Sequence, residues 1–273
     1  MILFRTSRRR NTRFRRGFTL IELVVVVAIV GVIAALLMTA LSAARNRTQR
    51  TACLNNLRQI NLGMRMYCDD SNDTSPSVKD ADFFSKSWSS YRRLMKDYVG
   101  VKGEPSARDK LFACPADTFY FDMRPVSNSS VKGLCGLWIV RASLHEQTNF
   151  DYSSYAFNGG ISNVFSFYTN SLGIGGLKLS SIKEPAKTVL ICEAPAFFPY
   201  SWHDPGNSST FGSVTYNNGA VLFMDAKNMV SFVDGHVSFI KIYWDPGPVQ
   251  PGIWALSMQY EPPVGYDYKW SAD

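Results

Sequence analysis

The longest hydrophobic segment of the chain runs from Leu23 to Ala44, 22 residues without a single charge. A helix of this length would extend roughly 33 Å at about 1.5 Å per residue, which matches the hydrocarbon core of a bilayer. Backbone groups in lipid must hydrogen-bond within the segment, so a helix is the expected state. The pattern therefore predicts one membrane-spanning helix near the N-terminus.

Beyond this segment, apolar residues continue at the spacing of one helix face. No proline occurs between Phe18 and Ser75, so nothing interrupts a helix there. The apolar positions are Cys53, Leu57, Ile60, Met64 and Tyr67, with Leu54 and Cys68 alongside. The spacing predicts that a single helix continues to about Asp70 and packs this face on a globular body.

The C-terminal third shows strand patterns instead. Short apolar runs predict strands at residues 187–192, 220–224 and 229–233. Asp234-Gly235 predicts a two-residue type I′ hairpin, which would place Phe232 opposite Val237 and form an antiparallel meander over residues 220–243. Residues 82–100 favour a short aromatic-rich helix, and residues 111–117 a short strand or turn.

Together these patterns predict an α+β protein, with a long N-terminal helix on an antiparallel β-sheet domain. The expected divisions are a basic leader (1–17), a transmembrane and assembly helix (18–44), an amphipathic continuation (45–72) and a globular body (73–273).

Charge is concentrated in the leader. The chain carries a net charge of +7, and residues 1–17 hold seven arginines and no acid, so the remainder is neutral. A neutral body lacks the basic surface that nucleic acids require, and no nucleic-acid partner is expected. The positive-inside rule predicts a cytoplasmic N-terminus and a body on the far side of the membrane.

Five cysteines occur, none in a C-x-x-C pair, which argues against a zinc ribbon or thioredoxin-like site. On one helix, Cys53 and Cys68 would lie roughly 22 Å apart, too far for a disulfide. Any bridge must therefore use Cys114, Cys135 or Cys192, and at least one thiol is left over. No metal and no cofactor is predicted.

Three ordinary explanations compete for the N-terminal segment. A secretory signal could be cleaved after residues 41–44, although its apolar core would be long. Ser7 and the arginines after it suggest a twin-arginine signal, and a plain membrane anchor fits everything except Glu22. A carboxylate at the mouth of an apolar span is unfavourable unless it has a partner.

The residues around Glu22 read Gly17-Phe18-Thr19-Leu20-Ile21-Glu22 before the apolar run. This segment resembles the leader of type IV prepilins, a group that includes the pseudopilins of type II secretion. The resemblance implies cleavage between Gly17 and Phe18 by a prepilin peptidase, methylation of the new Phe18 amine, and assembly with other pilin-like subunits through Glu22. It also implies a single-pass protein of the bacterial inner membrane, extracted into a periplasmic or surface filament on assembly.

The body resembles the prepilin-type H-X9-DG family. The similar segments are residues 53–60, 114–117, 154–159, 182–190 and 232–237. The histidine that names this family would fall at Met224, so no role is carried over for it. The acidic turn at residues 69–76 has no EF-hand spacing and is interpreted as a solvated turn, with calcium binding left open.

No nucleophile motif or metal-binding histidine pattern accompanies the three histidines, so the chain is expected not to be an enzyme. The predicted function is a pseudopilin subunit of a type II secretion-like pseudopilus. Two alternatives are a minor pilin of an adhesion or DNA-uptake pilus and an anchored envelope enzyme or carbohydrate-binding protein.

Overall fold

The structure is a computed structural model of the 273-residue chain. It describes residues 17–77, 91–103, 109–117, 120–122, 138–140, 153–159, 173–197, 201–204, 214–215, 221–222, 226–243 and 261–273. Two compact units are distinguished, Met1–Arg45 and Asn46–Asp273. Residues 82–90 of the helix predicted over 82–100 lie outside the described residues, as do Cys135 and Met224.

One helix, α1 (Leu20–Asp70), accounts for both N-terminal patterns, which confirms the predicted continuous helix. By length and composition it is able to cross a membrane. The helix ends where Asn72 and Asp73 adopt left-handed backbone angles (φ 55° and 62°) and the Asp73 N–H bonds the carbonyl of Cys68 at 2.7 Å. The Asp73 carboxylate accepts a hydrogen bond from the Ser180 N–H at 2.9 Å, so this acidic turn anchors the helix end to the body.

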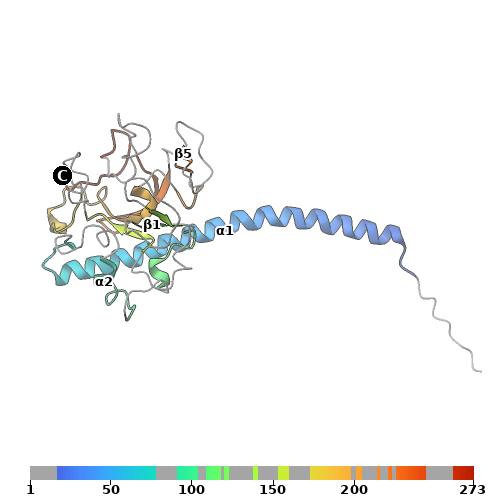
Figure 1. Ribbon diagram of the computed structural model, residues 1–273, viewed down its shortest axis with the longest axis horizontal. Helices are drawn as coiled ribbons and strands as arrows, with labels where there is room; N and C mark the ends of the chain where they lie inside the picture. The colour runs from blue at the N-terminus through green and yellow to red at the C-terminus, as the bar shows by residue number, and fades with distance from the viewer. Residues whose placement is uncertain are drawn as a thin grey trace, which may run out of the picture. The chain divides into compact units, whose positions relative to one another are not determined.

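The body is built on a four-stranded antiparallel sheet in the order β3-β4-β7-β8. The strands are β3 (Tyr155–Phe157), β4 (Val189–Glu193), β7 (Lys227–Phe232) and β8 (Val237–Lys241). Two small sheets pair β1 (Tyr120–Asp122) with β2 (Trp138–Val140) and β5 (Val214–Thr215) with β6 (Val221–Leu222). The body end of α1 runs along this part of the chain (Figure 1), where Asn61 bonds the Phe232 carbonyl of β7. The α+β, pilin-like fold class is therefore confirmed.

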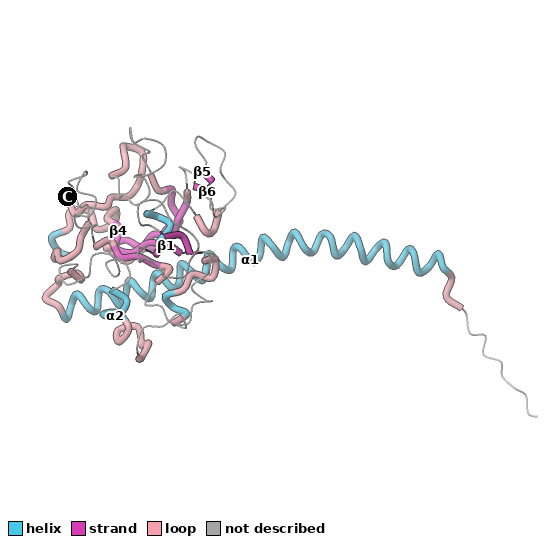
Figure 2. Tube along the Cα trace, in the orientation of Figure 1, coloured by secondary structure: helices cyan, strands magenta, loops and turns pink. Residues whose placement is uncertain are grey.

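The described residues also form short helical segments. They are α2 (Tyr91–Met95) and η2 (Lys110–Phe112), which precede β1, η5 (Leu179–Ser181) between β3 and β4, and η6 (Ala194–Phe197) after β4. The η segments are 3-10 turns. Loops and turns make up much of the rest of the described body (Figure 2). The predicted turn at 111–117 is present, since the Asp117 N–H bonds the Cys114 carbonyl at 3.0 Å.

The face of α1 predicted to pack on the body is buried. Cys53, Leu57, Ile60, Met64 and Cys68 have no exposed surface, whereas Tyr67 and Leu54 are only partly buried. Removal of apolar side chains from water is the main driving force for such docking. The helix therefore contributes one wall of the core.

The predicted hairpin register is wrong by one residue. Ser231, and not Phe232, lies opposite Val237. The loop has three residues, because the Phe232 N–H bonds the His236 carbonyl and the Gly235 N–H bonds the Phe232 carbonyl, both at 3.0 Å. Gly235 has a φ of 100°, as three-residue loops require at this position. Residues 228–232 are all buried, so burial does not distinguish the two faces of β7, and alternation could not fix the register.

The predicted meander is also wrong at its first strand. Residues 221–222 do form a strand, but β6 pairs with β5 and not with β7. Both edges of β7 are occupied, by β4 on one side and β8 on the other, so no edge remains for β6.

Candidate functional site

The residues predicted for processing and assembly lie at the start of α1. Phe18 is exposed, with 72% of its surface accessible, and a side chain added at Gly17 would meet nothing within 4 Å. Glu22 lies in the first turn of the helix. Both residues that flank the cleavage position, Gly17 and Phe18, are therefore accessible to solvent.

Glu22 forms a capping box with Thr19. Its Oε2 accepts hydrogen bonds from the Thr19 N–H at 2.9 Å and from the Thr19 hydroxyl at 2.7 Å. The Thr19 Oγ1 accepts a long bond from the Glu22 N–H at 3.4 Å. This arrangement satisfies donors left open at the helix start. The T-x-x-E spacing is the signal of such a box in the sequence.

The apolar half of α1 has large side chains with extensive exposed surface. Leu20 is 80% exposed, Leu36 67% and Leu41 69%, and each valine between them has at least half of its surface exposed. Isolated exposed apolar residues are common, but a continuous helical surface of this kind marks contact with a membrane or a partner. It is compatible with a single-pass anchor in the inner membrane.

Cys53, Cys68, Cys114 and Cys192 are buried thiols and form no disulfide with one another in the structure. The helical separation of Cys53 and Cys68 agrees with the predicted lack of a bridge between them. Cys135 lies outside the described residues, so a disulfide that uses it stays a prediction.

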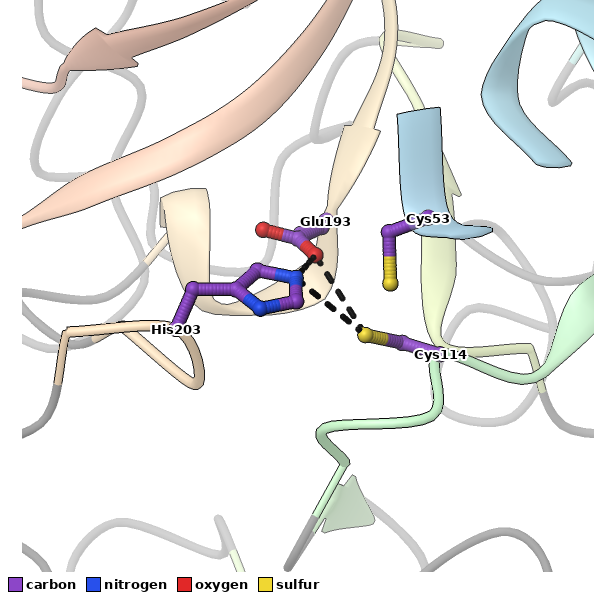
Figure 3. A group of neighbouring side chains, drawn as sticks. All are labelled: Cys53, Cys114, Glu193 and His203. Atoms are coloured by element: carbon purple, nitrogen blue, oxygen red, sulfur yellow. Dashed lines mark hydrogen bonds and ion pairs between the residues drawn. The ribbon is translucent and has the colours of Figure 1, made fainter. Parts of the chain in front are cut away.

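A second candidate site is a buried cluster of Cys53, Cys114, Glu193 and His203. Their two sulfur atoms, a carboxylate oxygen and a ring nitrogen all lie within 4.8 Å of one another. Figure 3 shows the four side chains pointing toward one another. Glu193 Oε1 lies 2.9 Å from His203 Nε2 and 3.4 Å from Cys114 Sγ, and the latter is 3.6 Å from His203 Nε2.

Four separate segments supply this cluster. Cys53 comes from the buried face of α1, and Cys114 from the turn after η2. Glu193 is the last residue of β4, and His203 follows η6 along the chain. The side chains of both Glu193 and His203 are almost completely buried, with 0% and 1% exposed surface.

Side chains of α1 hold the loops that carry two members of the cluster. Gln49 donates a hydrogen bond to the Pro115 carbonyl at 2.8 Å and Asn56 donates one to the Ala113 carbonyl at 3.3 Å, on either side of Cys114. Arg50 donates one to the His203 carbonyl at 3.0 Å. The helix thus fixes both loops against its own Cys53.

The cluster strongly perturbs its titrating groups. Burial lowers the pKa of His203, but hydrogen bonds and the negative charges of Cys53 and Glu193 outweigh burial and raise it to about 10. Burial raises the pKa of Cys114 well above its ordinary value, and the hydrogen bond with Cys53 adds to the effect. For Cys53, hydrogen bonds from Cys114 and His203 outweigh burial and lower the pKa. The site therefore favours a negatively charged Cys53 sulfur beside a cationic His203 imidazole, whereas Cys114 favours its neutral thiol.

His236 is a surface residue of the hairpin. Nδ1 of His236 contacts Asp234 at 2.7 Å, and its ring stacks on Phe232 with the centroids 4.1 Å apart. The side chain is 42% exposed, as expected for a hairpin residue. His203, in contrast, is buried and contacts Glu193.

Sequence reasoning missed the cluster. The sequence places Cys53 on an apolar helix face, and the four residues form no short motif. Glu193 and Cys114 are 79 positions apart. Only the tertiary structure brings these donors together.

Residues 12–38 match the family described as "Prokaryotic N-terminal methylation motif". This match indicates a type IV pilin-like prepilin signal and covers Gly17, Phe18 and Glu22. Comparison with curated proteins and with solved structures gave no match.

Proposed function

We propose that the chain is a pseudopilin subunit that polymerises into a type II secretion-like pseudopilus, and that it acts as a structural subunit and not as a catalyst. The match to the methylation motif supports a type IV pilin-like subunit. The observation that carries the assembly role is the exposed apolar surface of α1 directly after the motif.

Assembly would proceed from these N-terminal residues. The prepilin peptidase cuts after Gly17 on the cytoplasmic side and methylates the Phe18 amine. The apolar half of α1 holds the subunit in the inner membrane until neighbouring subunits replace the lipid around it. Both environments remove the same apolar surface from water, so exchange between them is energetically feasible.

The test compares a deletion strain of the native host with the same strain complemented by the parent chain. The three assays are protein secretion, surface adhesion and DNA uptake. The proposal expects loss of specific proteins from the culture medium, with their accumulation in the periplasm, and recovery on complementation. Surface adhesion and DNA uptake should be unchanged. Normal secretion with defective adhesion or uptake would instead identify a minor pilin. An unprocessed N-terminus, with all three assays normal, would favour an anchored envelope protein of another kind.

A further inference from the structure

The buried cluster has the dimensions of a tetrahedral metal site. With ordinary zinc–ligand distances, a sulfur lies about 3.6 Å from a nitrogen or oxygen ligand, and nitrogen and oxygen lie about 3.4 Å apart. The observed separations are 3.6 Å for Cys114 Sγ to His203 Nε2 and 3.4 Å for Cys114 Sγ to Glu193 Oε1. Glu193 and His203, at 2.9 Å, would need to separate by about 0.5 Å to admit the ion.

We propose that Cys53, Cys114, Glu193 and His203 bind one Zn²⁺ ion. Two thiolates, an imidazole and one carboxylate are donors that zinc accepts in four-coordinate sites. Calcium and magnesium need six or more oxygen ligands, or several bound waters, which two sulfur donors in a buried site do not supply. The donor set therefore selects a thiolate-binding ion over the hard cations.

The charges of the cluster also favour a cation. Two thiolates and a carboxylate carry three negative charges, and Zn²⁺ reduces this to one. The Arg50 guanidinium lies over the Phe239 ring, 4.6 Å from its centroid, and the same ring meets the His203 ring edge to face at 6.2 Å. Arg50 also bonds the His203 carbonyl, so a positive charge contacts the residue that would supply the imidazole ligand. Buried charges need such compensation.

Neighbouring groups hold the ligands in place. The Met229 N–H bonds Glu193 Oε2 at 2.9 Å, which leaves Oε1 to face the cluster. The bonds from Gln49 and Asn56 hold the backbone on either side of Cys114, and the bond from Arg50 holds the backbone of His203. Contacts of this kind fix metal ligands in position.

The ion would join distant parts of the body. All four ligands lie in the unit Asn46–Asp273, on α1, the turn after η2, the end of β4 and the segment after η6. Four protein ligands leave no open position for substrate, so the site is structural. Binding would therefore stabilise the attachment of α1 to the sheet and to the two loops.

The first experiment measures metal content. The full-length chain is purified in mild detergent from membranes of its native host, without added chelator, and analysed by inductively coupled plasma mass spectrometry. We expect about one zinc per chain in the parent and less than about a tenth of that in Cys53→Ser and Cys114→Ser. Cys68→Ser is the matched control, because Cys68 is equally buried on the same helix but lies outside the cluster. It should retain the parent's zinc.

A second experiment does not depend on whether the variants fold. Parent protein stripped with a strong chelator and reloaded with Co²⁺ should show the intense visible bands of a tetrahedral site and a thiolate-to-cobalt charge-transfer band. The stripped parent should melt at least about 5 °C lower, with recovery on adding Zn²⁺ but not Ca²⁺ or Mg²⁺.

Two results would overturn the zinc assignment. One is a metal-free parent in which alkylation before denaturation reveals a Cys53–Cys114 disulfide. The other is one equivalent of a different metal in place of zinc. Neither result bears on secretion or filament assembly, so the proposed function stands or falls separately.

Discussion

Asn61 of α1 donates a hydrogen bond from Nδ2 to the carbonyl of Phe232 at 2.8 Å, and the same amide contacts the Ser231 hydroxyl. Asn61 has only 2% of its surface exposed and lies between the helix and β7. This amide therefore forms a buried hydrogen-bonded link between α1 and β7.

Replacing Asn61 by Ala should destabilise the body by about 1–3 kcal/mol, because buried hydrogen-bonding groups lose their partner. Thermal unfolding of the full chain in detergent, followed by near-UV circular dichroism, measures the effect. Asn55→Ala is the control, since Asn55 lies on the exposed side of the same helix. Equal melting temperatures of the two variants would show that the hydrogen bonds of Asn61 contribute nothing to stability.

Gly63 marks the closest approach of α1 to the turn after α2. A Cβ at this position would lie 2.5 Å from Val99 Cγ1 and 3.7 Å from Tyr98 Cβ. Gly→Ala normally stabilises a helix by about 1 kcal/mol. Here, overpacking should reverse the sign and cost about 1–3 kcal/mol.

The double variant Gly63→Ala/Val99→Ala separates the two effects. Truncation of Val99 makes room for the new methyl group, so the double variant should be less destabilised than the sum of the single variants. Strict additivity in chemical denaturation would contradict the close contact.

Particular residues show how far the sequence could predict the fold. The 3.6-residue period from Cys53 to Met64 correctly predicted the buried helix face, because a helix with one apolar side has a single favourable orientation. The strand predicted at 187–192 corresponds to β4 (Val189–Glu193), because a short run of β-branched and other apolar residues favours a buried strand. The hairpin register was not, since β7 is buried on both faces and Gly235 serves equally well in a two- or a three-residue loop.

The two candidate sites also differ in how far the sequence could predict them. Gly17, Phe18 and Glu22 are close in sequence, so a local motif reveals them. The cluster of Cys53, Cys114, Glu193 and His203 depends on the docking of α1 against β4 and two loops. No local pattern encodes that docking, so only the structure could reveal the cluster.

Cleavage between Gly17 and Phe18 is the third prediction. The glycine lacks a side chain and lets the chain enter a peptidase site in an extended form. Mass spectrometry of protein from the native host should find a mature chain that begins at methylated Phe18, 256 residues long if the 17 leader residues are removed from 273. An N-terminus at Ala44 or Arg45 would instead identify an ordinary secretory signal and contradict the pilin-like processing.

The final prediction concerns the charge of Glu22. In the single chain, its carboxylate caps the helix through Thr19. After cleavage, the Phe18 amine lies four residues away, and an unpaired ammonium and an unpaired carboxylate at a membrane edge are both unfavourable. Pairing between neighbouring subunits relieves both charges and fixes their register. We therefore expect Glu22 to govern assembly and not the folding of the body.

A series of variants separates charge from capping. Glu22→Gln keeps a side chain that can form the capping box but removes the charge, and Glu22→Val removes both. Both should be processed normally, melt like the parent and fail to form filaments or support secretion. Glu22→Asp should be intermediate because its shorter side chain reaches less far. Thr19→Val, which loses only the hydroxyl contact, should assemble.

Sheared filaments quantified by immunoblot, beside the processed fraction in membranes, give the readout. If Glu22→Gln assembles as well as the parent while Thr19→Val fails, the capping box is the requirement and the charge is dispensable. If Glu22→Val also assembles, Glu22 is a stray residue at the membrane interface. The apolar half of α1 would then be a plain anchor, because no remaining group in its first turn could pair with a neighbour's amine.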